Sequence, residues 1–271
     1  MSSHCILFRR SLSEENEYRE AAKFFPPGEE LFEFRSEIPE GALVIGRYSV
    51  LPYYQELERE LKNRNSRMIN SYNAHSYIAN MDWYHDLKHI TPQTWFQGEW
   101  GSLPADESFI IKGLTNSRKF QWKTHMFAET KKGVRDVVGR LFDDTMLREQ
   151  GIVVRKYIPL ESFGEQINGL PISNEWRFFC LDGKILAEGF YWSNWIDELS
   201  QDFRTPPKEA VEKVKHALSL VPAHVRFITI AVAKTKEGDW TVIELNDGQM
   251  SGLSDIEPER LYSSLKSQLS R

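Results

Sequence analysis

Short apolar runs alternate with amphipathic stretches along the first hundred residues of this 271-residue sequence. Residues 42–46 form a continuous apolar run that predicts a buried strand, whereas residues 54–63 place apolar side chains at helical spacing among charged neighbours. A second strand at 67–70 and a second helix at 72–87 are expected to follow. Strands interleaved with helices favour a layered α/β fold over an all-α or an all-β fold.

The rest of the chain predicts further strands and helices after a turn-rich stretch at 98–106. We expect one helix over 131–149 and a hairpin over 176–188, in which an Asp-Gly pair forms the turn. Two later strands, 226–233 and 240–246, are expected to pair with each other. The overall expectation is an α+β arrangement of more than one sheet.

The composition argues against a membrane span, a disulfide framework and a nucleic-acid surface. The chain has 34 basic and 39 acidic residues and a formal net charge of -5, whereas a protein that holds a nucleic-acid backbone is usually basic. The longest apolar run, 227–233, is far shorter than the roughly 20 residues of a membrane-spanning helix. Cys5 and Cys180 stand far apart, so neither a disulfide framework nor a structural zinc site is expected. A cytoplasmic location fits best.

The strand at 240–246 ends in side chains that can bind a hard cation. With the period of two of a β-strand, Glu244 and Asn246 leave the same face, together with Trp240 and Val242. Their carboxylate and carboxamide oxygens suit Mg²⁺. A solvated strand end that runs into a turn is the commoner meaning of so short a pattern, and both interpretations stay open.

A lysine inside an apolar strand marks a second candidate site. Lys112 interrupts the strand 109–113, and the following loop carries Arg118 and Lys119. From 109 to 135 there are seven basic residues and one acidic residue, a local net charge of +6. Converging cations beside a loop suit a polyphosphate, and a lysine at a sheet edge beside a solvated loop explains the residues equally well. No Gly-rich loop of the Walker or Rossmann type accompanies them.

Arg177 in the expected hairpin is a third candidate. A two-residue turn at Asp182-Gly183 would pair positions whose numbers add up to 365, so that Arg177 faces Glu188 and shares a face with Glu175. Arg177 then either forms a cross-strand ion pair, worth under about 1 kcal/mol if exposed, or points at a phosphate group. The seven histidines show no metal-binding spacing, and no hydrolytic triad is indicated.

These segments, taken in order, resemble the ATP-grasp superfamily. The resemblance rests on Lys112 in its strand and on the segments 153–158, 175–179 and 242–249. Together with the phrase Gly-Arg-Tyr-Ser-Val-Leu-Pro at 46–52, they are similar to a bacterial and phage-associated clade that is named for two arginines and a lysine. The resemblance covers nearly the whole chain.

The resemblance implies a fold with three subdomains that clasp ATP. An N-terminal α/β subdomain of the pre-ATP-grasp type would span 1–103. The central subdomain with the phosphate loop would span 104–158, and the C-terminal subdomain with the metal site would span 159–271.

The resemblance also implies a carboxylate–amine ligase with ATP and Mg²⁺ as cofactors. A carboxylate would become an acyl phosphate, from which an amine displaces phosphate. Lys112 and Arg177 would be the catalytic residues, with Arg177 neutralising charge at the transferred phosphoryl group. Glu244 and Asn246 would bind Mg²⁺. The nucleotide would be bound by Lys112, Arg118, Lys119, Arg155, Lys156, Tyr157, Ile158, Glu175 and Arg177.

Two positions depart from the superfamily pattern. Arg155 stands where many members have a glutamate that contacts adenine. A metal-binding aspartate is usual opposite the Glu-x-Asn strand, but a turn at 237–238 would pair positions that add up to 475 and place Ala231 opposite Glu244. Ala231 cannot bind a cation, and we expect water or Asp247 to take that role.

Three activities are therefore open. The leading one is a ligase that acts on a small-molecule or peptide carboxylate and amine. An ATP-binding protein that has lost catalysis and an ATP-dependent phosphotransferase are the alternatives. Membranes and nucleic acids are not expected as partners.

Overall fold

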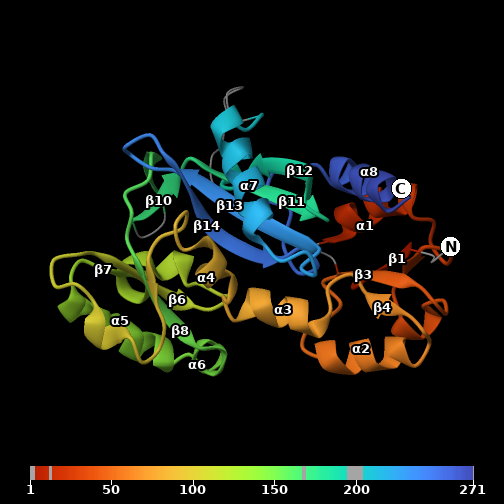
Figure 1. Ribbon diagram of the computed structural model, residues 1–271, viewed down its shortest axis with the longest axis horizontal. Helices are drawn as coiled ribbons and strands as arrows, with labels where there is room; N and C mark the ends of the chain where they lie inside the picture. Colours follow the sequence, from red (N-terminus) through yellow and green to blue (C-terminus); the bar gives the residue numbers. More distant parts are fainter. Residues whose placement is uncertain (1–3, 12–13, 167–168, 194–203, 271) are drawn as a thin grey trace.

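The structure is a computed structural model that describes residues 4–11, 14–166, 169–193 and 204–270. Its described strands form three four-stranded sheets and one two-stranded sheet, and helices pack beside them. Figure 1 shows an N-terminal region on the right, a central region at the lower left and a larger sheet above them. The expected mixed α/β fold is confirmed. No described helix has the length and apolar character that crossing a membrane requires.

The N-terminal sheet is parallel and has the strand order β2-β1-β3-β4. Its strands are β1 (His4–Phe8), β2 (Leu31–Phe32), β3 (Leu43–Arg47) and β4 (Arg67–Met68). Side chains of α1 (Glu15–Phe24) pack on one face and those of α2 (Tyr54–Lys62) on the other. The sequence predicted β3, α2 and β4, whereas β1, α1 and β2 had no counterpart among the predicted elements.

Two short helices, α3 (Tyr72–Ala79) and α4 (Trp83–Leu87), follow the N-terminal sheet. The Ser71 hydroxyl caps α3 by accepting a hydrogen bond from the backbone N–H of Ala74. The prediction of one helix over 72–87 is wrong, because Met81 adopts a positive φ of 60° that ends the helical path. In Figure 1, α3 bridges the N-terminal and central regions.

The central sheet is antiparallel and has the order β5-β8-β6-β7. It consists of β5 (Thr94–Trp95), β6 (Phe109–Gly113), β7 (Phe127–Ala128) and β8 (Ile152–Lys156). Because β5 pairs with β8, part of the segment expected to belong to the first subdomain lies in this sheet. The division at residues 103 and 158 stays a prediction.

Helices α5 (Lys131–Phe142) and α6 (Thr145–Gln150) pack on the central sheet. The prediction of one helix over 131–149 is wrong. The Asp144 carboxylate starts α6 afresh, since it accepts hydrogen bonds from the backbone N–H groups of Met146 and Leu147.

The C-terminal sheet is antiparallel and has the order β12-β11-β13-β14. Its strands are β11 (Glu175–Leu181), β12 (Lys184–Phe190), β13 (Phe227–Lys234) and β14 (Trp240–Asp247). Helix α7 (Lys208–Leu220) packs with α3 and α4 on one face, and α8 (Pro258–Leu269) packs with α1 on the other. Strands β9 (Ser162–Gln166) and β10 (Leu170–Ser173) form the separate two-stranded sheet.

A bulge in the hairpin of β11 and β12 changes the partner of Arg177 from the one that the sequence predicted. Near the turn the pairing is as expected, but the register shifts between Phe179 and Cys180, so that Arg177 faces Gly189. The predicted pair of Arg177 with Glu188 is therefore wrong, and Glu188 contacts Arg260 instead. Arg177 still shares a face of β11 with Glu175, as expected.

A second bulge decides the face on which Glu244 lies. Ala231 pairs with Glu244 as predicted, whereas Val232 pairs with Val242, which leaves Ile243 as the extra residue. The bulge turns Glu244 and Asn246 to the face opposite Trp240 and Val242, so the expectation that all four share one face is wrong.

Candidate functional site

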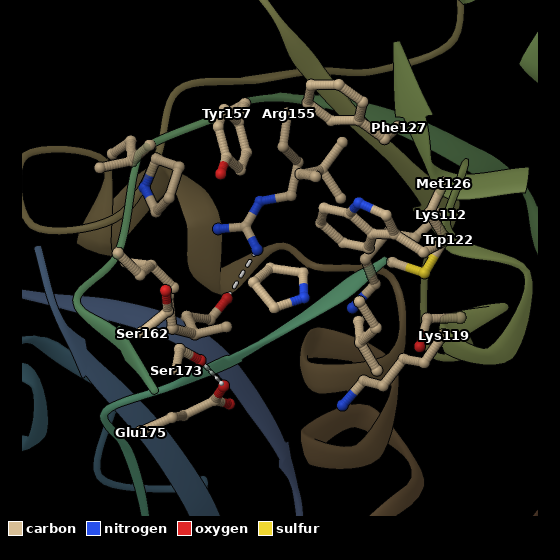
Figure 2. Close-up of a pocket in the computed structure, with 18 of the residues that line it drawn as sticks. Lys112, Lys119, Trp122, Met126, Phe127, Arg155, Tyr157, Ser162, Ser173 and Glu175 are labelled. Carbon is tan, nitrogen blue, oxygen red and sulfur yellow. Dashed lines mark hydrogen bonds between the residues drawn. The ribbon is translucent and has the colours of Figure 1, made fainter. Parts of the chain in front are cut away.

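A cavity of about 640 Å³ lies between the central sheet and the C-terminal sheet. Figure 2 shows aromatic and apolar side chains on one side of it, including Trp122, Phe127 and Tyr157. The rings of Trp122 and Phe127 stack with their centroids 5.8 Å apart, and Tyr157 meets Phe127 edge-on at 5.1 Å. Such a wall suits a flat heterocycle. The predicted site residues that line this cavity are Lys112, Lys119, Arg155, Lys156, Tyr157, Ile158, Glu175 and Glu244.

Glu244 is the centre of a buried ionic cluster at one end of the cavity. Its carboxylate lies 3.6 Å from the Lys112 ammonium and 3.3 Å from the Arg177 guanidinium. Burial of Glu244 alone would raise the pKa of its carboxyl, but the cationic side chains around it outweigh burial and hold that pKa at about 2. Burial lowers the pKa of Lys112. Glu244 is therefore a firmly ionised anion among four cationic side chains from four separate segments of the chain.

The Arg177 guanidinium has two fixed contacts, but one of its N–H donors has no hydrogen-bond partner among the described residues. It donates a hydrogen bond to the backbone oxygen of Gly252 at 2.8 Å, and its guanidinium lies over the ring of Tyr191 at 4.5 Å. Its Nε is buried and has no partner among the residues that the structure describes. Lys119 donates to the Tyr191 hydroxyl and lies 4.9 Å from the ring centre of Trp192. A buried donor without a protein partner is available to a bound ligand.

Glu175 also keeps an unused acceptor. One of its carboxylate oxygens accepts hydrogen bonds from Ser173 and from the Trp192 indole, each at 3.2 Å. The other oxygen is buried and makes no hydrogen bond to any described residue. Burial raises the pKa of Glu175. Figure 2 shows this side chain at the end of the cavity opposite Tyr157.

Arg155 is fixed as part of the cavity wall. Its guanidinium donates to Thr91 at 2.8 Å, to Thr94 at 3.1 Å and to the backbone oxygen of Ile243 at 2.6 Å. Burial lowers its pKa to about 10, so the side chain remains charged at neutral pH. Because Arg155 reaches across to β14, it ties the two sheets together along the cavity.

Of two other predicted nucleotide-binding residues, Lys156 lines the first cavity and Arg118 does not. The Lys156 ammonium donates to Glu107 at 2.6 Å at the rim of the cavity. Arg118 pairs with Asp144 at the start of α6 and lines neither of the two large cavities. The structure therefore does not bring Arg118 to the other predicted nucleotide-binding residues.

A second cavity, of about 750 Å³, lies on the other side of Glu244. It shares Ser117, Lys119 and Glu244 with the first cavity. Arg177 and Asn246 line the second cavity and not the first. Four carboxamide side chains contribute to its wall, namely Asn80, Asn116, Gln150 and Asn246. The sequence singled out Lys119, Arg177, Glu244 and Asn246 and, through the resemblance, the turn at 248–252 as the border of an acceptor pocket. It gave no signal for the other lining residues, because the wall is assembled from seven separate stretches of the chain.

Glu244 and Asn246 fit a single hard cation. They lie on one face of β14 at the junction of the two cavities. One carboxylate and one carboxamide match the sparse protein ligation of Mg²⁺, which keeps waters and binds phosphates for its other positions. No cluster of three or more His, Cys, Asp or Glu side chains within 4–11, 14–166, 169–193 and 204–270 is placed to bind a metal.

Asp247 does not fill the place left by Ala231, contrary to expectation. It alternates to the face of β14 opposite Glu244. One of its oxygens accepts hydrogen bonds from Asn70 and from the backbone N–H of Gln249, each at 3.0 Å, and the other lies 2.9 Å from His75. Of the two expected replacements for the usual aspartate, only water stays a prediction.

Solved structures show which class of fold this arrangement represents. The chain is similar to D-cycloserine synthetase DcsG, with a TM-score of 0.65 and 12% identity over 98% of this chain and 100% of that one. It is also similar to D-alanine–D-alanine ligase from Bacillus anthracis, with a TM-score of 0.58 and 14% identity over 100% and 99% of the two chains. The ATP-grasp ligase PsnB, complexed with a precursor peptide and AMPPNP, gives a TM-score of 0.57 and 12% identity over 98% and 97%. The fold is that of an ATP-grasp ligase.

The family is defined more narrowly by the sequence. A family model for an ATP-grasp domain, family 3 of the clade named for two arginines and a lysine, matches residues 99–265. The chain therefore belongs to this family, which confirms the resemblance seen in its sequence. A comparison with curated proteins finds no significant match.

Proposed function

We propose that this protein is an ATP-dependent carboxylate–amine ligase that binds the nucleotide in the first cavity and the acceptor in the second. The observation that carries the proposal is the position of Glu244 with Lys112 and Arg177 where the two cavities meet. A triphosphate that runs along the first cavity would bring its end to this cluster. The proteins similar in fold, a synthetase and two ligases, support the same class of reaction.

The chain offers a side chain for each part of the nucleotide. The aromatic wall around Trp122 and Tyr157 would take adenine, and the free oxygen of Glu175 would accept a hydrogen bond from a ribose hydroxyl. Lys112 would contact the α- and β-phosphates, since its ammonium is buried at the cluster. Lys119, which lines both cavities, would follow the triphosphate to its end.

Arg177 would act at the transferred phosphoryl group. It lines the acceptor cavity, its guanidinium is fixed by Gly252 and Tyr191, and its Nε is available. Phosphoryl transfer depends mainly on positioning and on charge stabilisation, which a fixed guanidinium supplies. Glu244 and Asn246 would hold Mg²⁺, which would shield the phosphate charges from each other. The composition-based expectation of a cytoplasmic location is consistent with the use of ATP.

Ala231 favours one alternative, a protein that binds ATP without turning it over. Ala231 faces Glu244 and supplies no metal ligand. Loss of one ligand from Mg²⁺ need not abolish catalysis, because this ion usually keeps several waters. A phosphotransferase is the other alternative, and the product distinguishes it from a ligase.

The test is an incubation of the protein with ATP, Mg²⁺ and mixtures of amino acids and short peptides. Release of ADP and phosphate is followed together with mass spectrometry of the products. A condensed product, heavier by the amine minus water, is the expected result. A phosphorylated product without condensation would point to a phosphotransferase, and ATP binding without turnover would point to the impaired form.

A further inference from the structure

His75 and Asp247 form a hydrogen-bonded pair in the wall of the second cavity. His75 lies on α3 and Asp247 ends β14, and Nδ1 of the imidazole is 2.9 Å from a carboxylate oxygen of Asp247. The two side chains are 13% and 3% exposed. Both line the cavity that Arg177 and Glu244 also line.

The pair is held in place by neighbouring elements. The ring of Tyr54, on α2, stacks on the imidazole with centroids 4.6 Å apart. The Tyr54 hydroxyl donates to the backbone oxygen of Asn70 at 2.6 Å and accepts from the side chain of Gln249 at 2.7 Å. Asn70 in turn donates to Asp247. The imidazole is therefore fixed both by stacking and by its carboxylate partner.

This arrangement sets the state of the imidazole. Because Nδ1 faces a carboxylate, it carries the proton of the neutral ring, and Nε2 is left as an acceptor. The titratable groups that contact His75 are Asp247 of β14, Tyr54 of α2 and Tyr72 of its own helix. Burial raises the pKa of Tyr54, so this phenol stays uncharged beside the ring. Imidazole is the side chain that exchanges a proton near neutral pH.

We propose that His75 is the general base that activates the attacking amine in the proposed ligation, with Asp247 as its positioning residue. The inference rests on the proposed function. A primary amine arrives as an ammonium ion near neutral pH and must lose a proton before it attacks. Nε2 takes that proton, and the nitrogen electron pair forms the C–N bond. The C–O bond to phosphate then breaks, and the departing phosphate keeps its electron pair and takes a second proton from nitrogen.

No other described side chain of this cavity suits the task. Glu244 is paired with Lys112 and Arg177, and the low pKa of its carboxyl makes it a weak base. Burial raises the pKa of Tyr191, which therefore keeps its proton. The Glu149 side chain is 73% exposed at the outer edge. His75 is the candidate base that remains.

Comparison of hydroxylamine with an amino acid as the nucleophile distinguishes loss of the general base from loss of acyl-phosphate formation. Hydroxylamine is largely uncharged near pH 7 and attacks an acyl phosphate without a base, whereas an amino acid needs one. The protein is incubated with ATP, Mg²⁺ and an amino acid mixture, with and without hydroxylamine. Hydroxamate is measured by its ferric complex, and condensed product is measured by mass spectrometry.

We expect His75→Gln to lower condensation by about 10²- to 10⁴-fold while hydroxamate formation falls less than about threefold. The matched control is His85→Gln, since His85 stacks on Phe96 and lines neither large cavity. It should leave both rates unchanged. Calorimetric ATP affinity equal to that of the unmodified protein shows that the His75 variant is folded.

The unmodified protein gives a test that needs no variant. Its ratio of condensation to hydroxamate formation should rise with pH and then level off, as expected for a condensation that needs a base. An equal loss of both products in His75→Gln, or no loss of either, would overturn the role of His75 and leave the ligase intact. Absence of both products in the unmodified protein, with no ADP released, would instead overturn the proposed function and this inference with it.

Discussion

Two buried ionic clusters of this protein differ in how fully their polar atoms are paired. In the first, the Arg47 guanidinium is fully buried and donates to Glu17 at 2.7 Å and to the backbone oxygens of Gly248 and Ser251. Tyr262 donates to the same carboxylate at 2.6 Å. In the second, around Glu244, the nearest ammonium is 3.6 Å away and Arg177 keeps an unpaired Nε.

We interpret the first as a structural cluster and the second as the ligand-binding cluster of the proposed function. The Arg47 cluster joins β3 to the segment that follows β14, because Arg47 donates to the backbone oxygens of Gly248 and Ser251. Ser251 directly precedes Gly252, whose backbone oxygen accepts the hydrogen bond that orients Arg177. None of the side chains of the Arg47 cluster is among those with a buried, unpaired polar atom in the part of the chain that the structure describes. The Glu244 cluster concentrates charge beside two cavities and leaves donors and acceptors free, which is the expected state of a site that binds a charged ligand.

The largest expected effect is on stability, in the Arg47 cluster. Arg47→Met should lower the free energy of unfolding by about 3–5 kcal/mol, because Glu17 would be left buried without its cation. Urea denaturation measures the change. The control is Arg226→Met, which removes an exposed pair with Asp182 and should cost under about 1 kcal/mol. Equal losses of unfolding free energy in the two variants would show that the buried Arg47 pair contributes no more to stability than an exposed pair.

The next effect is on catalysis, in the Glu244 cluster. Arg177→Met should lower kcat of the proposed ligase by about 10²- to 10³-fold, since a fixed charge at the transferred group is lost. ATP affinity should change less than about tenfold, and the unfolding midpoint in urea should stay near that of the unmodified protein. A loss of stability like that of Arg47→Met would make Arg177 a structural residue.

A smaller effect is expected on the stability of the protein at acidic pH. The pKa of Glu244 is held at about 2, below the 4.5 of a free glutamate, so its ion pairs contribute stability that is present above pH 4.5 and is lost as the pH falls toward 2. The unmodified protein should therefore lose more unfolding free energy than Glu244→Gln between pH 5 and pH 3. Parallel curves for the two proteins would mean that Glu244 titrates normally.

The smallest effect is expected from restoring a metal ligand. Ala231→Asp would place a carboxylate opposite Glu244, on a buried position of β13. We expect a loss of roughly 1 kcal/mol in unfolding free energy without Mg²⁺, because two carboxylates then repel each other. Mg²⁺ should reverse the loss and tighten ATP binding a few-fold. No response to Mg²⁺ would place the cation away from this face.

The sequence could predict the parts of the fold and site that depend on local pattern. The strand of Lys112 and the pairing of Ala231 with Glu244 follow from apolar runs and turn positions, and both are observed. The partner of Arg177 could not be predicted, because a bulge needs no particular residue type. The pairing of His75 with Asp247 could not be predicted from the sequence either, because the two are 172 positions apart and only tertiary packing brings them together.

Calorimetric titration of the protein with ATP in the presence of Mg²⁺ addresses the site itself. We expect one ATP per chain, and roughly ten- to hundredfold weaker binding in Lys112→Met, since a charge-assisted contact to phosphate contributes about 1.5–3 kcal/mol. Arg226→Met should bind as the unmodified protein does. Absence of ATP binding in the unmodified protein, or equal affinity in Lys112→Met, would contradict the assignment of the Glu244 cluster as a triphosphate site.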